Sequence, residues 1–262
     1  MPAENRVEVP RQGLSVTLFD PDIFIPILVH LLVMCGRFSI AVRIGIFTRR
    51  FGIEEPFDCV LPRYNIAPSE NVPIVVREGA VNRVTTMRWG LLPIRASEGR
   101  HGPEPINARA EGLTKNRMFH DLLVNRRCLV PATGFYEWRD EGQRKVPFYI
   151  SRKDNSLFAI AGLFNARKDL QGNETRSFTL VTTAPNDLVG QYHDRMPAIL
   201  SPGGEAAWAD NETDITGAIM DILVPYPSEG MEATEVSSSV NNPANKTEAT
   251  VTGIRQQTLE GY

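Results

Sequence analysis

The sequence predicts an α+β protein, a β-rich single domain in which a mostly antiparallel sheet or barrel-like core carries short helices at its periphery. Three observations support this class. The chain has 262 residues, enough to bury one substantial core. Its hydrophobic fraction of 42% is ordinary for a soluble globular protein. Short segments rich in β-branched and aromatic residues follow one another at the close spacing typical of antiparallel strands.

The expected strands and helices are short. Segments 72–76 and 81–89 flank a turn at Glu78-Gly79 and predict two strands around it. Further strands are expected at 127–130, 133–138, 147–151, 157–163 and 177–183. Helices are expected at 119–124, 187–192, 205–209 and 216–223. A break at 202–204 (PGG) should precede the third helix.

The domain is expected to run from residue 34 to 242, between an N-terminal extension (1–33) and a polar surface tail (243–262). Segment 23–33 is apolar but too short to span a bilayer, so no membrane is expected. Asp20 and Asp22 precede it where a signal peptide carries Lys or Arg. We interpret 1–33 as an upstream-start artefact or a removable propeptide. A bacterial lipoprotein signal is the alternative, which Met34 fits poorly.

Charge and cysteine content exclude several classes of protein. The net charge of −3 argues against coating nucleic acid by bulk charge, so any such site must be a local basic patch. Cys35, Cys59 and Cys128 are odd in number and lack CxxC spacing, which disfavours a disulfide framework or a zinc site. Glycine-rich phosphate loops, HExxH and GxSxG are absent from the sequence, so nucleotide hydrolysis, zinc proteolysis and α/β-hydrolase chemistry have no support.

Cys35 directly follows Met34, so translation from Met34 and trimming of that methionine would make Cys35 N-terminal. An N-terminal cysteine carries a thiol and a free α-amine on adjacent carbons, and the pKa of that amine is about 8. Such a pair condenses with an aldehyde, first through nitrogen and then through sulfur, to give a stable thiazolidine. An internal cysteine has only an amide nitrogen. The function therefore depends on whether Cys35 ever has a free amine.

Two clusters between residues 63 and 93 have open interpretations. Segment 63–68 (RYNIAP) offers a cation, a ring and an amide, but we interpret it as a strand ending in a turn. Trp89, in 87–93 (MRWGLLP), either fills the core, as most tryptophans do, or stacks on a base, which contributes roughly 1–3 kcal/mol per base.

In 106–111 (INARAE) a strand would place Asn107, Arg109 and Glu111 on one face and small alanines on the other. That face is either an ordinary solvated surface or a site in which an amide orients a sugar and a guanidinium binds phosphate.

Two further segments carry titratable groups. In 134–138 (GFYEW), Glu137 lies among aromatic residues. Burial would raise its pKa and suit it to general acid/base catalysis, whereas an outward-facing glutamate on an amphipathic strand explains the pattern equally well. In 191–197 (QYHDRMP), His193 could transfer protons, Asp194 could orient it and Arg195 could bind phosphate. A single histidine is more often structural or exposed.

Taken in order, these segments closely resemble the SOS response-associated peptidase (SRAP) family, whose members are abasic-site processing proteins. The resemblance covers residues 34 to about 242, and residues 1–33 fall outside it. It is carried by MCGRF, RYNIAP, RWGLLP, INARAE, GFYEW and HDRMP, followed by Val236-Ser237 and Val240-Asn241.

The resemblance implies a sensor and shield of abasic sites in single-stranded DNA, which acts through a covalent thiazolidine at Cys35. It implies an acid/base role for Glu137, a role in sugar-ring opening for His193, and a role in orienting the sugar for Asn107. Phosphate contacts are implied for Arg37, Arg109, Arg117 and Arg195. A lining of the DNA path is implied for Asn65, Pro68 and Trp89.

The resemblance further implies a monomer that needs no cofactor or metal and acts in the cytoplasm on DNA, with the replication-fork machinery as a further partner. A hydrolase activity directed at its own leader, and a lyase activity, are also expected of this family. The alternatives are a non-covalent single-stranded-DNA-binding module, or a cysteine peptidase that uses Cys35 with His193. This chain departs from the family pattern in the residues before Cys35. While they are attached, Cys35 has no free amine.

Overall fold

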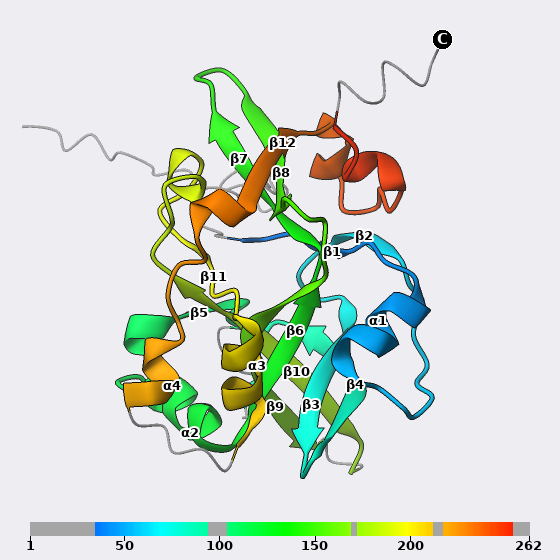
Figure 1. Cartoon of the computed structure of the whole chain (residues 1–262), viewed down its shortest axis with the longest axis vertical. Helices are drawn as coiled ribbons and strands as arrows, with labels where there is room; N and C mark the ends of the chain where they lie inside the picture. The colour runs from blue at the N-terminus through cyan, green and yellow to red at the C-terminus, as the bar shows by residue number, and fades with distance from the viewer. Residues whose placement is uncertain (1–34, 94–103, 169–171, 212–216, 254–262) are drawn as a thin grey trace, which may run out of the picture. The chain divides into compact units, whose positions relative to one another are not determined.

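Five strands close into a barrel in the computed structural model, which describes residues 35–93, 104–168, 172–211 and 217–253 (Figure 1). Neighbouring strands pair antiparallel except for one parallel pair, β10 with β4, and β9 pairs back with β10 to close the barrel. The order is β10 (Glu174–Thr183), β4 (Val81–Trp89), β3 (Asn71–Glu78), β6 (Arg127–Ala132) and β9 (Phe158–Lys168). The predicted β-rich, barrel-like class is confirmed.

Two short strands extend this sheet along β10. Strand β5 (Asn107–Arg109) runs parallel to β10, and β11 (Met196–Pro197) runs antiparallel to its last residues. Both therefore meet at the C-terminal end of β10, near Thr182. This places two of the segments singled out in the sequence, 106–111 and 191–197, at one end of one strand.

A second sheet has five antiparallel strands and includes β1, the first strand of the described chain. Its order is β12 (Met231–Glu235), β8 (Lys145–Arg152), β7 (Gly134–Asp140), β1 (Phe38–Ile40) and β2 (Arg63–Ile66). Only Thr133 separates β6 of the barrel from β7 of this sheet. The chain thus passes directly from one sheet to the other, and Glu137 lies on the first strand after that passage.

The predicted strands are all present, most of them longer than expected, whereas the helices agree less well. Helices α2 (Arg117–Asn125), α3 (Pro202–Ala209) and α4 (Gly217–Asp221) lie at predicted places. Segment 187–192 forms only a short 3-10 helix, Val189–Gln191. The predicted break at 202–204 is wrong, because Ser201 caps the helix and Pro202 occupies its first turn, where proline is tolerated. None of the described helices is long and apolar enough to cross a membrane.

Helix α1 (Ile44–Phe51) was not predicted. It buries Phe47 and Phe51, which are four residues apart and therefore share one face. It ends at Gly52, whose φ of 60° is the left-handed C-cap conformation that glycine adopts without steric cost. The two phenylalanines and this glycine were a signal in the sequence, although Ile44 and Ile46 on the exposed side blur the periodicity.

The C-terminal segment 243–253 is polar and largely exposed, but it is not a free tail. The side chain of Thr250 is buried, and the Lys246 ammonium contacts the Asn65 carbonyl and the Glu70 carboxylate. The short 3-10 helix Glu248–Thr250 packs against β2. This part of the predicted tail belongs to the fold, whereas residues 254–262 lie outside the described residues.

Candidate active site

Cys35 is held beside Glu137 by the pairing of β1 with β7. Phe38 lies opposite Phe135, and the Tyr136 amide donates to the carbonyl of Arg37. Because the strands are antiparallel, each step back from Phe38 is a step forward from Phe135. The residues just before β1 therefore reach the level of Glu137.

The backbone nitrogen and the sulfur of Cys35 both contact one carboxylate oxygen. Its backbone nitrogen donates to Glu137 Oε1 at 3.1 Å, and its Sγ donates to the same oxygen at 3.2 Å. Cys35 is 1% exposed and has a φ of 42°, a left-handed conformation that is unfavourable for a residue with a side chain. Such conformations cluster at functional sites, where the surrounding structure holds them in place.

Glu137 is buried, so the outward-facing interpretation of this glutamate is wrong. Desolvation is the largest influence and raises its pKa to about 7. This pKa of about 7 already includes the two hydrogen bonds from Cys35, which lower it, and the charge of Asp194, which raises it. Near neutral pH this carboxyl group therefore exists in both protonation states, as general acid/base catalysis requires.

The Cys35 side chain is a thiol rather than a thiolate in this arrangement. Burial raises its pKa well above the usual range, and the charge of Glu137 and its hydrogen bond raise it further. The charge of Arg195 acts in the opposite direction. The influence of Asp194 on Glu137 and of Arg195 on Cys35 places segment 191–197 close to this pair.

The electrostatics of Glu137 give a prediction for the full-length chain, in which the Cys35 nitrogen is an uncharged amide. A carboxyl whose pKa is raised on folding contributes stability that is fully present below its unfolded pKa of 4.5 and is lost as pH rises through about 7. The free energy of unfolding of the wild type, relative to Glu137→Gln, should fall by about 3 kcal/mol between these pH values and stay level above them. Urea unfolding of both proteins from pH 4.5 to 8 measures this difference. A constant difference over that range would show that Glu137 is not desolvated.

His193 is half-buried, and two groups approach its Nδ1. The Arg195 backbone N–H donates to Nδ1 at 3.1 Å, while Asp194 Oδ1 lies 2.8 Å from the same atom. An unprotonated Nδ1 can accept the hydrogen bond from the amide, whereas a hydrogen bond to Asp194 would require a proton on Nδ1. Burial, the largest influence, lowers the pKa of His193, and Asp194 is 80% exposed, so water screens its charge. The neutral ring with its proton on Nε2 is therefore favoured.

Arg195 lies beside the C-terminal end of β10 and forms an ion pair with an acidic partner. Its two terminal nitrogens donate to the two carboxylate oxygens of Glu111 at 2.8 and 2.9 Å, and Nη2 also donates to the Thr182 carbonyl at 2.7 Å. The fork-to-fork geometry is the strong form of this ion pair. Hydrogen bonding to Arg195 is the main cause that lowers the pKa of Glu111, and the charge of Arg109 contributes. Sequence analysis noted Glu111 but gave it no role.

The INARAE segment alternates as predicted, although its strand is shorter. Ala108 and Ala110 are buried, Asn107 is half-buried, and Arg109 and Glu111 are exposed. The strand ends at Arg109, and a 3-10 helix, Ala110–Gly112, follows. Asn107 lies opposite Leu180 and Arg109 opposite Thr182 on β10, so Arg109 is an exposed cation near the Arg195–Glu111 pair.

Trp89 belongs to the core, and the interpretation of this ring as a stacking platform is wrong. It is fully buried, it lies edge-on to Phe38 with ring centroids 5.0 Å apart, and it is stacked near Phe178 at 6.3 Å. Its Nε1 donates to the Ile106 carbonyl at 3.0 Å. A ring enclosed in this way has no face left for a base.

Asn65 and Arg37 are also buried, which contradicts a surface role for either in the DNA-free protein. Arg37 Nη1 donates to Asn65 Oδ1 at 3.0 Å. Both side chains then hold the C-terminal segment through backbone carbonyls, which belong to Val240 and Asn241 for Arg37 and to Val240, Asn242 and Asn245 for Asn65. Arg37 and Asn65, which the resemblance implied as DNA contacts, thus bind each other and the backbone of residues 240–245.

Pro68 and Arg117 lie where solvent reaches them. Pro68 is half-buried at the turn after β2, and Arg117 is exposed in the first turn of α2, after the cap residue Asn116. In the described part of the chain no hydrogen bond or ion pair joins either of them to the Cys35–Glu137 pair. Their roles in binding DNA remain predictions.

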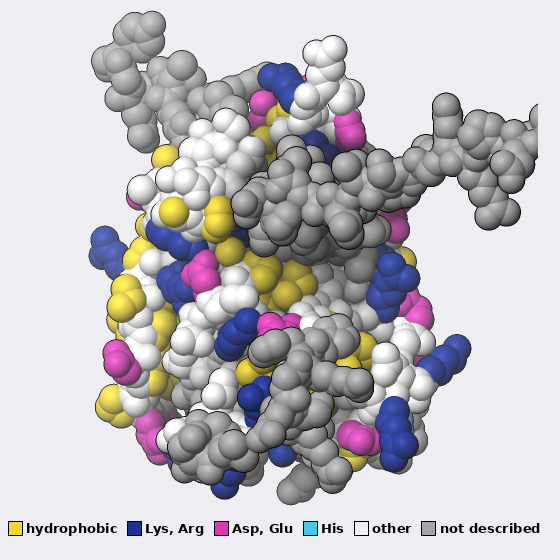
Figure 2. Space-filling model, turned by 180° about the vertical axis from the view of Figure 1, so that it is seen from behind, with side chains coloured by type: hydrophobic (Ala, Val, Ile, Leu, Met, Phe, Trp, Pro, Cys, Tyr) yellow, Lys and Arg dark blue, Asp and Glu magenta, His cyan; other side chains and the backbone are white. Residues whose placement is uncertain are grey.

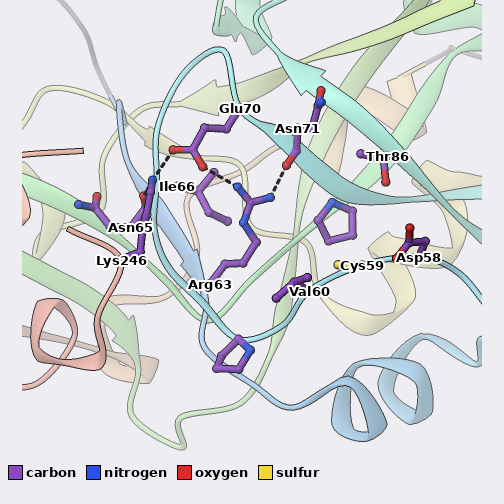
Figure 3. Close-up of a pocket in the computed structure, with 12 residues that line it drawn as sticks. Asp58, Cys59, Val60, Arg63, Asn65, Ile66, Glu70, Asn71, Thr86 and Lys246 are labelled. Carbon is purple, nitrogen blue, oxygen red and sulfur yellow. Dashed lines mark hydrogen bonds and ion pairs between the residues drawn. The ribbon is translucent and has the colours of Figure 1, made fainter. Parts of the chain in front are cut away.

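A pocket of about 450 Å³ lies apart from this chemistry, beside β2 and β3 (Figure 3). Arg63 extends across it and contacts the Asn71 carbonyl and the Glu70 carboxylate. Cys59 lines the pocket, and burial raises the pKa of its thiol. Neither Cys35 nor Glu137 is among the residues that line this pocket.

Known proteins resemble this chain over most of its length. The family model described as SOS response associated peptidase (SRAP) matches residues 34–243. The chain is 39% identical over 215 residues to abasic site processing protein YoqW of Bacillus subtilis, covering 81% of this chain and 96% of that protein. It is 29% identical to abasic site processing protein YedK of Escherichia coli, covering 81% of this chain and 89% of that protein.

A solved structure supports the same conclusion. A crystal structure of a protein from Bacteroides thetaiotaomicron superimposes with a TM-score of 0.74 at 27% identity, covering 84% of this chain and 99% of that one. The chain therefore belongs to the SOS response-associated peptidase (SRAP) family.

Proposed function

We propose that this protein captures abasic sites in single-stranded DNA through a covalent thiazolidine formed by Cys35 when that residue is N-terminal. The observation that carries the proposal is the convergence of the Cys35 nitrogen and Sγ on one oxygen of Glu137. A vicinal amine and thiol are the two nucleophiles that a thiazolidine needs. Here one acid/base group reaches both of them.

The steps balance without a redox partner. The open-chain abasic sugar exposes an aldehyde, to which the amine of Cys35 adds to give a carbinolamine. Loss of one water gives an imine, and the thiol then adds across the C=N bond, its proton passing to the nitrogen. The ring retains the sugar carbon, the nitrogen and the sulfur, and the only product released is water.

Glu137 suits these reaction steps because its carboxyl group can both accept and donate a proton. As a carboxylate it removes the proton from the attacking nitrogen, and as an acid it protonates the departing hydroxyl. A chain that begins at Cys35 would place an ammonium beside it, which lowers the pKa of the carboxyl below that in the full-length chain. The thiol, protonated at rest, passes its proton to the same oxygen when it closes the ring.

The DNA strand would be guided by exposed cations rather than by bulk charge. Figure 2 shows Lys and Arg side chains spread over one face among acidic ones. Arg109 is exposed and Arg195 lies nearby, which supports phosphate contacts beside the thiol. Since Trp89 is enclosed in the core, its ring makes no contribution to base stacking.

Removal of the preceding residues is part of the proposal. The Cys35 nitrogen is the leaving atom if the bond before it is hydrolysed, and Glu137 Oε1 lies 3.1 Å from it. This contact supports a self-directed peptidase step, in which water adds to the carbonyl of residue 34 and the amine leaves protonated. Methionine trimming after translation from residue 34 gives the same amine.

The test compares two chains that share every residue of the site. A chain beginning at Cys35 and the full-length chain with an uncleavable leader are each mixed with uracil-excised single-stranded DNA. We expect a heat- and SDS-stable adduct only from the first, because only it has an amine. Equal adduct from both would refute the thiazolidine. Tight binding without adduct would favour a non-covalent binding module, and hydrolysis of unrelated peptides would favour a cysteine peptidase.

A further inference from the structure

Arg195 and Glu111 form an ion pair that the proposed function leaves unexplained. The carboxylate faces the two terminal nitrogens of the guanidinium in a bidentate arrangement, at 2.8 and 2.9 Å. This is the edge with which arginine binds two oxygens of a phosphate. In the DNA-free protein that edge is therefore already occupied by an anion of the protein itself.

The other contacts of the Arg195 guanidinium leave little for an incoming phosphate. Nη2 is also bound to the Thr182 carbonyl at 2.7 Å. Nε is buried and has no hydrogen-bond partner among the described residues. A buried donor without a partner is costly, so the resting pair does not satisfy the guanidinium completely. A phosphate reaches the terminal nitrogens only by displacing Glu111.

The two partners differ in a way that makes this exchange feasible. The side chain of Arg195 is 12% exposed, whereas that of Glu111 is 60% exposed. A strand that approaches from solvent thus meets the carboxylate first, and Glu111 can rotate into water while Arg195 stays in place. Arg109 lies close enough to lower the pKa of Glu111, so a second cation is present beside the pair.

We infer that Glu111 is a resident phosphate substitute which sets how weakly the site binds undamaged single-stranded DNA. The inference rests on the proposed function, because it concerns the same strand at the same site. Each binding event must break the Arg195–Glu111 pair, so non-covalent affinity is reduced. An abasic strand meets the same cost as it binds but is then held covalently, so Glu111 lowers occupancy by intact DNA without shortening the lifetime of the adduct.

The experiment measures binding of the full-length chain to a fluorescent oligothymidine by anisotropy, at several salt concentrations. Glu111→Gln should tighten binding about three- to tenfold and steepen the dependence of log K on log salt by about 0.7, since one more cation releases a counterion. Glu111→Ala should do the same. The matched control is Glu174→Gln, which removes an equal charge from an exposed pair with Arg176 at the other end of β10 and should leave binding unchanged.

A double-mutant cycle assigns the effect to Arg195. In an Arg195→Gln background, Glu111→Gln should give no tightening, because the cation it releases is absent. Unchanged or weaker binding by Glu111→Gln would overturn the inference and show that Glu111 only supports Arg195. If the wild type binds no single strand and the chain beginning at Cys35 forms no adduct, the proposed function itself fails. Binding by the wild type without tightening defeats the inference alone.

Discussion

Replacing Cys35 with alanine, in a chain that begins at that position, should remove the stable adduct with abasic DNA while leaving a trace that borohydride can trap. The alanine chain keeps its α-amine and still forms an imine. It has no sulfur to close the ring, so the product stays hydrolysable. We expect the adduct that survives heating to fall about a hundredfold or more, which corresponds to about 2.7 kcal/mol. Denaturing gels run with and without reductant measure the two species.

The controls separate sulfur chemistry from loss of the fold. Cys59→Ala removes a half-buried thiol from the pocket beside β2 and should leave adduct formation unchanged. Cys35 is buried, but alanine lacks only its sulfur atom, so the substitution leaves a small space rather than a large cavity. The variant should therefore still unfold cooperatively. A heat-stable adduct of normal yield from the alanine chain, without reductant, would contradict ring closure through sulfur.

The Cys35–Glu137 pair was predictable only in part, because the strand pairing that forms it joins residues distant in sequence. The sequence predicted a strand around Glu137, which β7 confirms, whereas no strand was predicted at Phe38–Ile40. Whether Glu137 faced inward could not be decided from alternation, because both of its neighbours are aromatic. The register of β1 against β7, a pairing of residues about 100 positions apart, decides it.

The errors share a physical cause, which is that burial depends on contacts distant in sequence. From the sequence, Trp89 is equally compatible with a surface position and a core position, and the contact with Phe178 decides for the core. The polarity of Asn65 suggested a ligand contact, yet carbonyls near the C-terminus satisfy its amide. Glu111 was visible two residues after Arg109, but its partner Arg195 is 84 residues away, brought there by β10.

Glu137→Gln should slow adduct formation by a chain beginning at Cys35 by about 10²- to 10⁴-fold, the usual contribution of a positioned acid/base group. Glutamine has nearly the same shape, and its amide oxygen can still accept from the Cys35 nitrogen and sulfur. What it cannot do is take up a proton. The loss therefore reports proton transfer rather than positioning, and single-turnover kinetics on abasic single strands measure it.

The pH dependence distinguishes this role from a structural one. In the wild type the rate should depend on ionisation of both the carboxyl group and the α-amine, whose pKa is about 8 in the absence of interactions. In Glu137→Gln only the amine remains, so the rate should rise with pH along a single limb. A low pH-independent rate in the variant, or a wild-type profile already described by the amine alone, would show that Glu137 holds Cys35 in place without moving its protons.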